Sequence, residues 1–159
     1  MSSAELDAVD RGILHLLQED ARNLTPVDIA RRLPVSEGTV RNRIERLEDD
    51  GVIRGYVPTL DYEAAGFPLK VAFTCTAPVS RQAALAESVL DTHRVVNVQE
   101  LVSSRGNVRV VGVATDLNEL MELAEDLIDA GLVIEEQTLM RHEYTQPFNH
   151  FGEEAATQN

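Results

Sequence analysis

Lysine is nearly absent from this sequence of 159 residues, and positive charge as a whole is scarce. Of the 14 basic residues, 13 are arginine and only Lys70 is lysine, whereas aspartate and glutamate number 27, so the formal net charge is -13. Solvated carboxylates with almost no lysine favour a proteome adapted to a salty cytosol, and an acidic mesophilic protein is the alternative. This charge balance bears on solubility and association rather than on fold.

Cysteine and long apolar runs are also scarce. Cys75 is the only cysteine, which excludes an intrachain disulfide, and no Cys/His spacing of the zinc type is present. No uncharged apolar run approaches the roughly 18 residues that suggest a membrane-spanning helix. We therefore predict no metal site and no membrane partner, expect a cytoplasmic location, and interpret Cys75 as a small buried residue of a strand.

The first 60 residues have the pattern of short helices. In LDAVDRGILHLL, an apolar stripe with helical spacing is formed by Leu6, Val9, Ile13, Leu16 and Leu17. In TPVDIARRL, Thr25 is the expected N-cap, Pro26 occupies the first helical position, and Asp28 completes a capping box. Pro34 ends this second helix, and a tight turn separates it from the next.

A third helix is predicted in EGTVRNRIERLEDD, with Ser36 as its N-cap and Gly51 at its end. Its apolar stripe would dock on the first two helices, while Gly38, Asn42 and Glu45 would point away from that stripe. Three short helices with a tight turn before the third form a helix-turn-helix. The segment VIRGYVPTL is predicted to be extended and wing-like.

Five of the 14 basic residues fall between positions 31 and 46, which predicts a DNA-binding surface. A major groove accepts a helix, Arg and Asn read base edges, and Arg contacts phosphates. We expect base contacts from Thr39, Arg41 and Asn42, and phosphate contacts from Arg31, Arg32 and Arg46. The full set of candidate DNA-binding residues is Arg31, Arg32, Ser36, Thr39, Arg41, Asn42 and Arg46. The alternative is a packing module with a solvated surface, and Arg43, near the apolar stripe, is a candidate for packing.

These residues resemble the N-terminal region of the Lrp/AsnC (feast/famine) transcription regulators. The matching pieces are Leu6-Asp7 and Asp10, Ile13-Leu14, DAR, DIA, Ser36, Arg43-Ile44, RLEDDGVI, and the GY that leads to Asp61 and Gly66. The resemblance implies sequence-specific binding to a palindromic double-stranded DNA operator, a homodimer or higher oligomer, and a small-molecule effector such as an amino acid. Together with the charge balance it predicts a halophilic archaeal source.

The rest of the chain changes to a pattern of strands and helices. Strands are predicted at KVAFTCTA, VVNVQELV, VRVVGVA and LVIEEQTLMRHEY, and helices at SRQAALAESVLDTH and DLNELMELAEDLIDAG. The order βαββαβ predicts a ferredoxin-like α+β domain, and the resemblance implies the same order. We expect inward-facing side chains at Ala84, Leu85, Ser88 and Val89 in the first helix and at Leu117, Leu120, Met121, Ala124, Leu127 and Ile128 in the second.

The charge distribution supports a division into two modules, because residues 1–60 hold 8 basic and 11 acidic residues, whereas residues 61–159 hold 6 and 16. A chain of this length can form two small domains, each with a modest core. We predict a helix-turn-helix domain at 1–60, a linker at 61–69, an oligomerising and ligand-sensing βαββαβ domain at 70–145, and an extended tail at 146–159. Phe148 and Phe151 of the tail would contact a neighbour.

The turn between the second and third strands departs from the family pattern. Family members usually carry Gly-x-x-Asp there, whereas this chain has GNVR, so that Arg109 stands where the carboxylate is expected. The resemblance implies an effector site, for which the candidates are Ser103, Arg105, Gly106, Asn107, Arg109 and Thr138. An ordinary free amino acid does not follow as its ligand. Arg105 and Arg109 would face an acidic ligand, or they would be surface residues that pair with nearby carboxylates.

Two other classes of function remain as alternatives. Lrp-like sirohaem decarboxylases resemble the helix-turn-helix but carry a His-Asn-Tyr and Tyr-Asn-Leu-Trp-Phe type stretch, where this chain has VVNVQELVSSRGNVRVVGV without His, Tyr or Trp. No nucleophile–base pair, Gly-rich phosphate loop or pair of catalytic carboxylates appears by spacing, so we predict neither catalysis nor a cofactor. The second alternative is an assembly or metabolite-sensing protein that does not bind DNA.

Overall fold

The computed structural model describes residues 5–156, and for residues 153–156 only the backbone. The chain forms two compact units, Met1–Pro58 together with Tyr144–Asn159, and Thr59–Glu143. The chain therefore passes between the units twice. Within the described residues, no helix is both long and apolar enough to cross a membrane.

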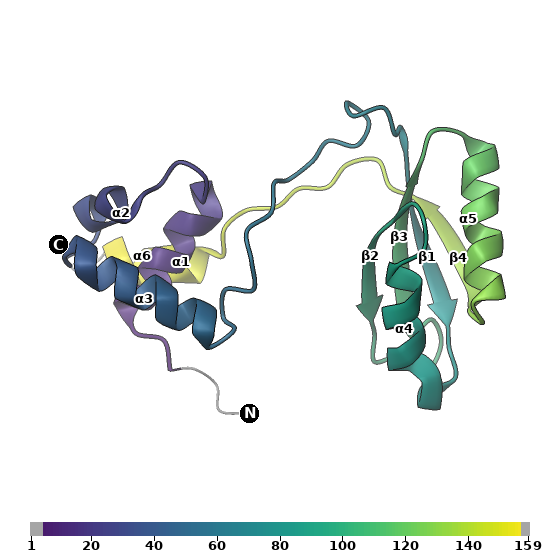
Figure 1. The fold of residues 1–159 in the computed structure, drawn as a ribbon, viewed down its shortest axis with the longest axis horizontal. Coiled ribbons are helices and arrows are strands. Elements are labelled where there is room, and N and C mark those ends of the chain that lie inside the picture. Colours follow the sequence, from purple (N-terminus) through teal and green to yellow (C-terminus); the bar gives the residue numbers. More distant parts are fainter. Residues whose placement is uncertain (1–4, 157–159) are drawn as a thin grey trace. The chain divides into compact units, whose positions relative to one another are not determined.

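The first unit contains the three predicted helices, which are α1 (Ala8–Asp20), α2 (Pro26–Arg32) and α3 (Glu37–Asp49) (Figure 1). Each begins after a residue whose side chain accepts a hydrogen bond from the backbone three positions on, and these N-caps are Asp7, Thr25 and Ser36. Thr25 and Asp28 form the predicted capping box. The caps satisfy backbone N–H groups that a first helical turn leaves without partners.

Helix α3 ends as predicted, because Gly51 takes a positive φ of 71° directly after the C-cap Asp50, a conformation that glycine adopts at least cost. Residues 54–60 form neither a helix nor a strand. The core of the unit comes from all three helices, and its buried members are Ile13, Leu14, Leu16, Ile29, Leu33, Val40 and Leu47.

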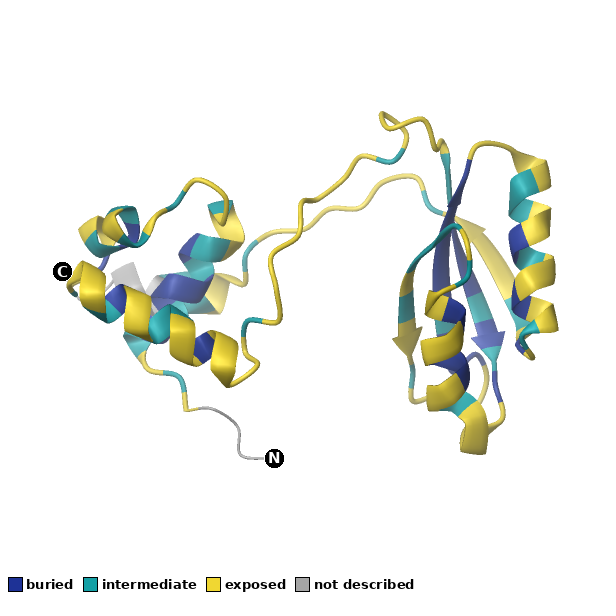
Figure 2. Ribbon diagram, in the orientation of Figure 1, coloured by how far each residue is buried: buried dark blue, intermediate teal, exposed yellow. Residues whose placement is uncertain are grey.

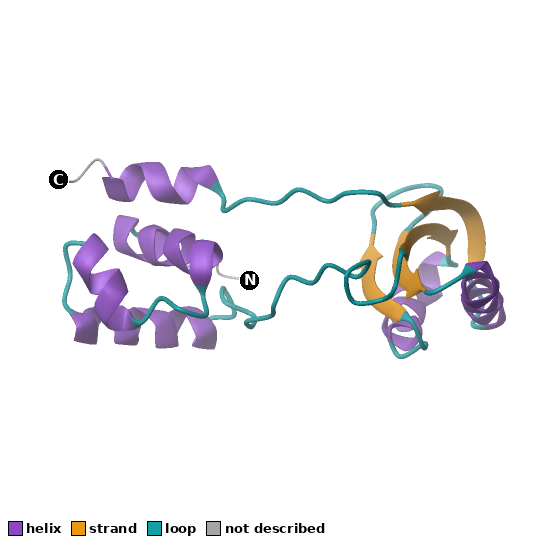
Figure 3. Cartoon of the chain, turned by 90° about the horizontal axis from the view of Figure 1, so that it is seen from above, coloured by secondary structure: helices purple, strands orange, loops and turns teal. Residues whose placement is uncertain are grey.

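The C-terminal segment differs from the sequence prediction. Instead of an extended tail, residues Asn149–Ala156 form helix α6, which packs along α1 (Figures 1 and 3). Phe151 packs on the core of this chain's own first unit, and a Cβ atom on Gly152 would come within 2.9 Å of the His15 ring. The prediction is wrong for 149–156 because the apolar partner on α1 is distant in sequence. Residues 157–159 lie outside the described part.

The second unit has the predicted βαββαβ order. Its elements are β1 (Leu69–Thr76), the short 3-10 turn η1 (Val79–Arg81), α4 (Gln82–Leu90), β2 (Val95–Glu100), β3 (Val108–Ala114), α5 (Leu117–Asp129) and β4 (Val133–Leu139). The sheet order is β2-β3-β1-β4 with antiparallel neighbours. Both helices cover the same sheet face (Figure 3), so the ferredoxin-like prediction is confirmed.

The core of the second unit lies between that face and the two helices, where the buried residues gather (Figure 2). Its members from the strands include Val71, Phe73, Val108 and Val110, and its members from the helices include Leu85, Ala86, Val89, Leu123 and Leu127. Cys75 is buried in β1, as predicted, and burial raises the pKa of its thiol to about 11.

Several helix residues lie differently from the prediction. In α4, Ala84 and Ser88 are exposed and Ala86 is buried instead. In α5, Leu123 and Leu127 are the fully buried residues, whereas three members of the predicted stripe are exposed, namely Leu117, Met121 and Ile128. A helix touches a sheet along a line narrower than its apolar stripe, so the i, i+4 pair at the centre of the contact is buried and the flanks are not.

Candidate nucleic-acid interface and effector site

Helix α3 keeps one side free of the core of its unit. Val40 and Leu47 are buried, whereas its exposed positions include Glu37, Gly38, Arg41, Asn42 and Glu45. The positions predicted to face away from the apolar stripe are therefore exposed. At the start of the helix, Ser36 Oγ accepts a hydrogen bond from the Thr39 backbone N–H at 3.2 Å and lies 2.9 Å from Thr39 Oγ1. Ser36 and Thr39 thus fix each other at the helix N-terminus.

All five arginines between positions 31 and 46 are paired with carboxylates. Three pairs lie at the surface, and they are Arg31 with Asp28 at 3.4 Å, Arg32 with Glu19 at 3.7 Å, and Arg41 with Glu37 at 2.7 Å. Exposed pairs of this kind contribute about 0–1 kcal/mol to stability. These three arginines can therefore exchange a carboxylate for a phosphate or a base at little cost.

Arg43 and Arg46 are held differently, because both contact a fully buried carboxylate. Oδ2 of Asp10 in α1 lies 2.6 Å from Nη2 of Arg46, and Oδ1 of Asp10 lies 3.1 Å from Nη1 of Arg43. Nη1 of Arg43 also contacts Asp7 Oδ2 at 2.7 Å. Arg43 therefore packs within the unit, and Arg46, which is predicted to contact phosphate, is bound to α1 as well.

The charges around Asp7 stabilise one another. The backbone N–H of Asp10 donates to the Asp7 carboxylate at 2.9 Å, and this bond, followed by the bond from Arg43, lowers the pKa of Asp7. The bond to Asp7 in turn raises the pKa of Arg43. Both groups therefore stay charged at neutral pH, as the link between α1 and α3 requires.

The carboxylate partners are the site residues that sequence reasoning misses. Glu37 and Arg41 could have been found, because residues four apart on a helix face each other. Asp7 and Asp10 stand three apart at a helix start, and that spacing indicates only a cap. Their partners in α3 are 33 to 36 positions away, and no local pattern reveals such a contact.

The turn between β2 and β3, predicted to hold an effector, is fixed by internal hydrogen bonds. Asn107 is buried, its Oδ1 accepts from the Ala77 N–H at 2.8 Å, and its Nδ2 donates to the Ala77 carbonyl at 3.0 Å. Gln82 Nε2 donates to the carbonyls of Asn107 and Leu101 at 2.9 and 3.1 Å. Asn107 therefore ties the turn to the end of β1, and both of its side-chain polar atoms are used there.

The neighbouring turn residues are also engaged. Gly106 has a φ of 69° and donates its N–H to Thr76 Oγ1 at 3.0 Å, and a Cβ atom there would lie 2.5 Å from Thr74. The Arg105 guanidinium donates two hydrogen bonds to Glu135 Oε2, from Nε at 2.8 Å and from Nη2 at 2.6 Å. Arg105 thus pairs with a carboxylate at the surface, and its role towards an effector stays a prediction. Ser103 Oγ donates to the Arg105 carbonyl at 2.6 Å.

The last two effector candidates lie on the sheet. Arg109 is in register with Thr74 and Gln99, and Thr138 with Ala72. Thr74 and Ala72 alternate along β1 with the core residue Phe73, so they lie on the face away from the helices. The structure thus places four candidates in the turn and two on the open sheet face.

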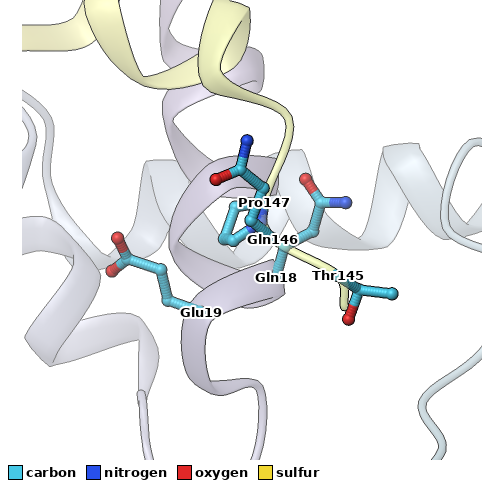
Figure 4. A pocket seen from close by; sticks show the side chains of 5 residues that line it. All are labelled: Gln18, Glu19, Thr145, Gln146 and Pro147. Atoms are coloured by element: carbon cyan, nitrogen blue, oxygen red, sulfur yellow. The ribbon is translucent and has the colours of Figure 1, made fainter. Parts of the chain in front are cut away.

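A polar groove lies beside α1 in the first unit. It holds about 500 Å³ and is lined by Gln18, Glu19, Thr145, Gln146 and Pro147 (Figure 4). Glu19 in its wall also contacts His15 at 3.1 Å and Arg32 at 3.7 Å. Across the described part of the chain, no three His, Cys, Asp or Glu residues are grouped so that they could hold a metal ion.

Comparisons with known proteins agree with this geometry. A family model described as winged helix-turn-helix DNA-binding matches residues 6–54. An uncharacterised HTH-type transcriptional regulator of Pyrococcus furiosus is 51% identical over 65 residues, which is 41% of this chain and 43% of that protein. This match thus spans less than half of the relative's length.

Longer matches extend the likeness to the second unit. The HTH-type transcriptional regulator LrpA of Pyrococcus horikoshii is 32% identical over 126 residues, which cover 77% of this chain and 86% of LrpA. The fold is shared with a transcriptional regulator of Neisseria meningitidis solved with L-Met, with a TM-score of 0.72 and 24% identity over 90% of this chain and 94% of that one. This chain therefore belongs to the Lrp/AsnC family of helix-turn-helix transcriptional regulators.

Proposed function

We propose that this chain regulates transcription by inserting α3 into the major groove of operator DNA. The observation that carries the proposal is the capped three-helix unit, matched by the winged helix-turn-helix model, whose third helix leaves Arg41 and Asn42 exposed. Arginine pairs in bidentate fashion with guanine and asparagine with adenine. Thr39, half-buried at the same end of α3, supplies a further base contact.

Phosphate contacts come from the start of the motif. Arg31 and Arg32 end α2 and are held only by exposed carboxylates, so that they can turn to the DNA backbone. Ser36 lies at the N-terminus of α3, where backbone N–H groups and the helix dipole favour an anion. These contacts position the helix, and the base contacts specify the sequence.

The second unit is proposed to form the dimer. Its sheet has α4 and α5 on one face, while the other face carries the apolar Ala72, Val111 and Val113 beside Arg109. Ala72, Val111 and Val113 are already buried within the chain, so a second copy on that face would cover the half-buried Thr74 and Arg109 around them. It would also pair two α3 helices on a palindromic operator, with half-sites about one helical turn apart.

An effector is proposed to act through the same unit. The Neisseria meningitidis regulator of this fold was solved with L-Met, which supports a small ligand of that size. The arginine at position 109, where the family carries a carboxylate, favours an acidic ligand. The single lysine and the excess of carboxylates support a salt-rich cytoplasm of a halophilic source as the place where the protein works.

The test is selection from a pool of random double-stranded DNA in concentrated potassium chloride. We expect the native chain to enrich a palindromic motif and the double variant Arg41→Ala/Asn42→Ala, with unchanged circular dichroism, to enrich none. Equal enrichment by both chains would remove the base-reading role from α3. Absence of enrichment by the folded native chain would contradict the proposed function.

A further inference from the structure

Asp10 is the only charged side chain among the described residues that is fully buried. Its carboxylate accepts hydrogen bonds from three donor groups, namely the Asp7 backbone N–H at 3.1 Å, Arg43 Nη1 at 3.1 Å to Oδ1 and 3.2 Å to Oδ2, and Arg46 Nη2 at 2.6 Å. Two of the three donors belong to α3, whereas Asp10 itself lies in the first turn of α1.

The burial of Asp10 separates the arginines of the motif into two classes. Loss of an arginine from an exposed carboxylate leaves a solvated charge, which changes the energy little. Loss of either arginine from Asp10 would leave a buried carboxylate with one charged partner fewer, which is more unfavourable than the same loss at an exposed carboxylate. Arg31, Arg32 and Arg41 can therefore exchange partners when DNA arrives, and Arg43 and Arg46 cannot.

We propose that Asp10 is a positioning residue that clamps the recognition helix α3 to α1 through Arg43 and Arg46, so that these two arginines orient the helix instead of neutralising phosphates. The inference rests on the proposed function, because it concerns how α3 meets DNA. It gives Arg46 a role other than the predicted phosphate contact. The clamp sets the angle of α3 before DNA binds, and base discrimination depends on that angle.

Two arginine variants test the division. Each phosphate contact adds about 1 to the slope of log affinity against log salt concentration. Arg41→Gln, at a position proposed to read a base, is expected to relax the selected motif with no change in thermal midpoint. Arg46→Gln is expected to leave the slope unchanged and to lower the midpoint of the first unit by about 5 °C or more.

The Asp10→Asn variant distinguishes a positioning role of Asp10 from a purely stabilising one. It frees Arg46 for phosphates, whereas Arg43 keeps its bond to Asp7, so the salt slope should steepen by up to about 1. At the same time the ratio of operator affinity to random-DNA affinity should fall at least tenfold, measured below the unfolding transition. If Asp10→Asn is too unstable for this, Arg46→Gln and Arg43→Gln serve instead, with the same expected loss of the ratio and an unchanged slope.

A double-mutant cycle without DNA keeps the two proposals separable. The effects of Asp10→Asn and Arg46→Gln on stability should be strongly non-additive. If Asp10→Asn does not fold, the same result is expected for the cycle formed by Arg46→Gln and Arg43→Gln. Additive effects, or a slope reduced by Arg46→Gln without any loss of thermal midpoint, would overturn the clamp. A non-additive cycle in a native chain that selects no DNA would instead overturn the proposed function.

Discussion

At the scale of single residues, carboxylates hold the arginines of α3, the helix proposed to read DNA. Arg41, expected to contact a base edge, is bonded to Glu37 through Nε at 3.1 Å and Nη2 at 2.7 Å. DNA must therefore compete with Glu37 for this guanidinium. Carboxylates of this acidic chain are therefore present on the proposed DNA-binding surface itself.

This competition predicts a gain of affinity. Glu37→Gln should tighten operator binding by about two- to fivefold, because an exposed pair is worth about 0.2–1 kcal/mol. Fluorescence anisotropy with labelled operator DNA measures the change. Glu45→Gln is the matched control, since it removes the same charge from an exposed position of α3. An equal gain in both variants would assign the effect to net charge alone.

A second residue-scale prediction concerns Asn107, which we expect to be structural. Asn107→Ala would leave the Ala77 N–H and carbonyl buried without partners, and should lower the free energy of unfolding by about 2 kcal/mol or more. Urea unfolding followed by circular dichroism measures this value. Asn97→Ala, at an exposed position of β2, should change it by less than about 0.5 kcal/mol. Similar values for both variants would contradict the assigned role.

At the scale of helices and strands, the local sequence predicts an element correctly where cap or turn residues mark its ends. The caps Thr25 and Ser36 and the glycine at 51 locate α2 and α3 from the sequence alone, and the turn SSRGN separates the two middle strands correctly. The side of α5 that faces the sheet was not predictable, because its apolar stripe is wider than the contact. Helix α6 was not predictable either, since it depends on a partner surface more than 130 positions away.

Helix α6 yields an element-scale prediction. Phe151 packs on the core of the helix-turn-helix unit and also meets Phe148 edge to face at a centroid distance of 4.9 Å. Phe151→Ala should therefore lower the stability of that unit by about 1–2 kcal/mol. The more exposed Phe148→Ala should cost less. Thermal unfolding of the full chain measures both, and a larger loss for Phe148→Ala would contradict the placement of α6.

The link between β2 and α5 predicts a pH dependence. Arg94 lies directly before β2 and pairs with Glu119 at 3.1 Å, and its hydrogen bond lowers the pKa of Glu119 from the ordinary 4.5 to about 2. The stability from this carboxylate is complete above pH 4.5 and is lost as the pH falls towards 2. Glu119→Gln should therefore flatten the fall of the unfolding midpoint in that range, whereas the exposed Glu125→Gln should keep the native profile.

At the scale of the whole molecule, the chain carries a net charge of -13 and still has to approach a polyanion. With Arg43 and Arg46 committed to Asp10, only Arg31, Arg32 and Arg41 of the motif remain for exchange. In the salt-rich cytoplasm proposed for this chain, the Debye length would be about 3 Å at 1 M salt, and steering over longer distances would be weak. Specific bonds to bases therefore have to supply most of the discrimination.

This arrangement predicts a shallow salt dependence. Three exchangeable arginines per protomer give a slope of log affinity against log salt of at most about -3 per protomer. Titration of operator DNA between 0.2 and 2 M potassium chloride, roughly the span over which screening becomes nearly complete, measures it. A much steeper slope would mean that further cations, Arg46 first among them, contact the backbone.

The most direct measurement is recovery of genomic DNA bound in the cell by the native chain and by Arg41→Ala/Asn42→Ala, followed by sequencing of both pools. We predict discrete enriched sites that share a palindromic motif for the native chain, and their loss in the variant at equal protein abundance. Enriched sites that are the same for both chains, or none for a folded native chain, would contradict the account of α3 as the helix that reads the operator.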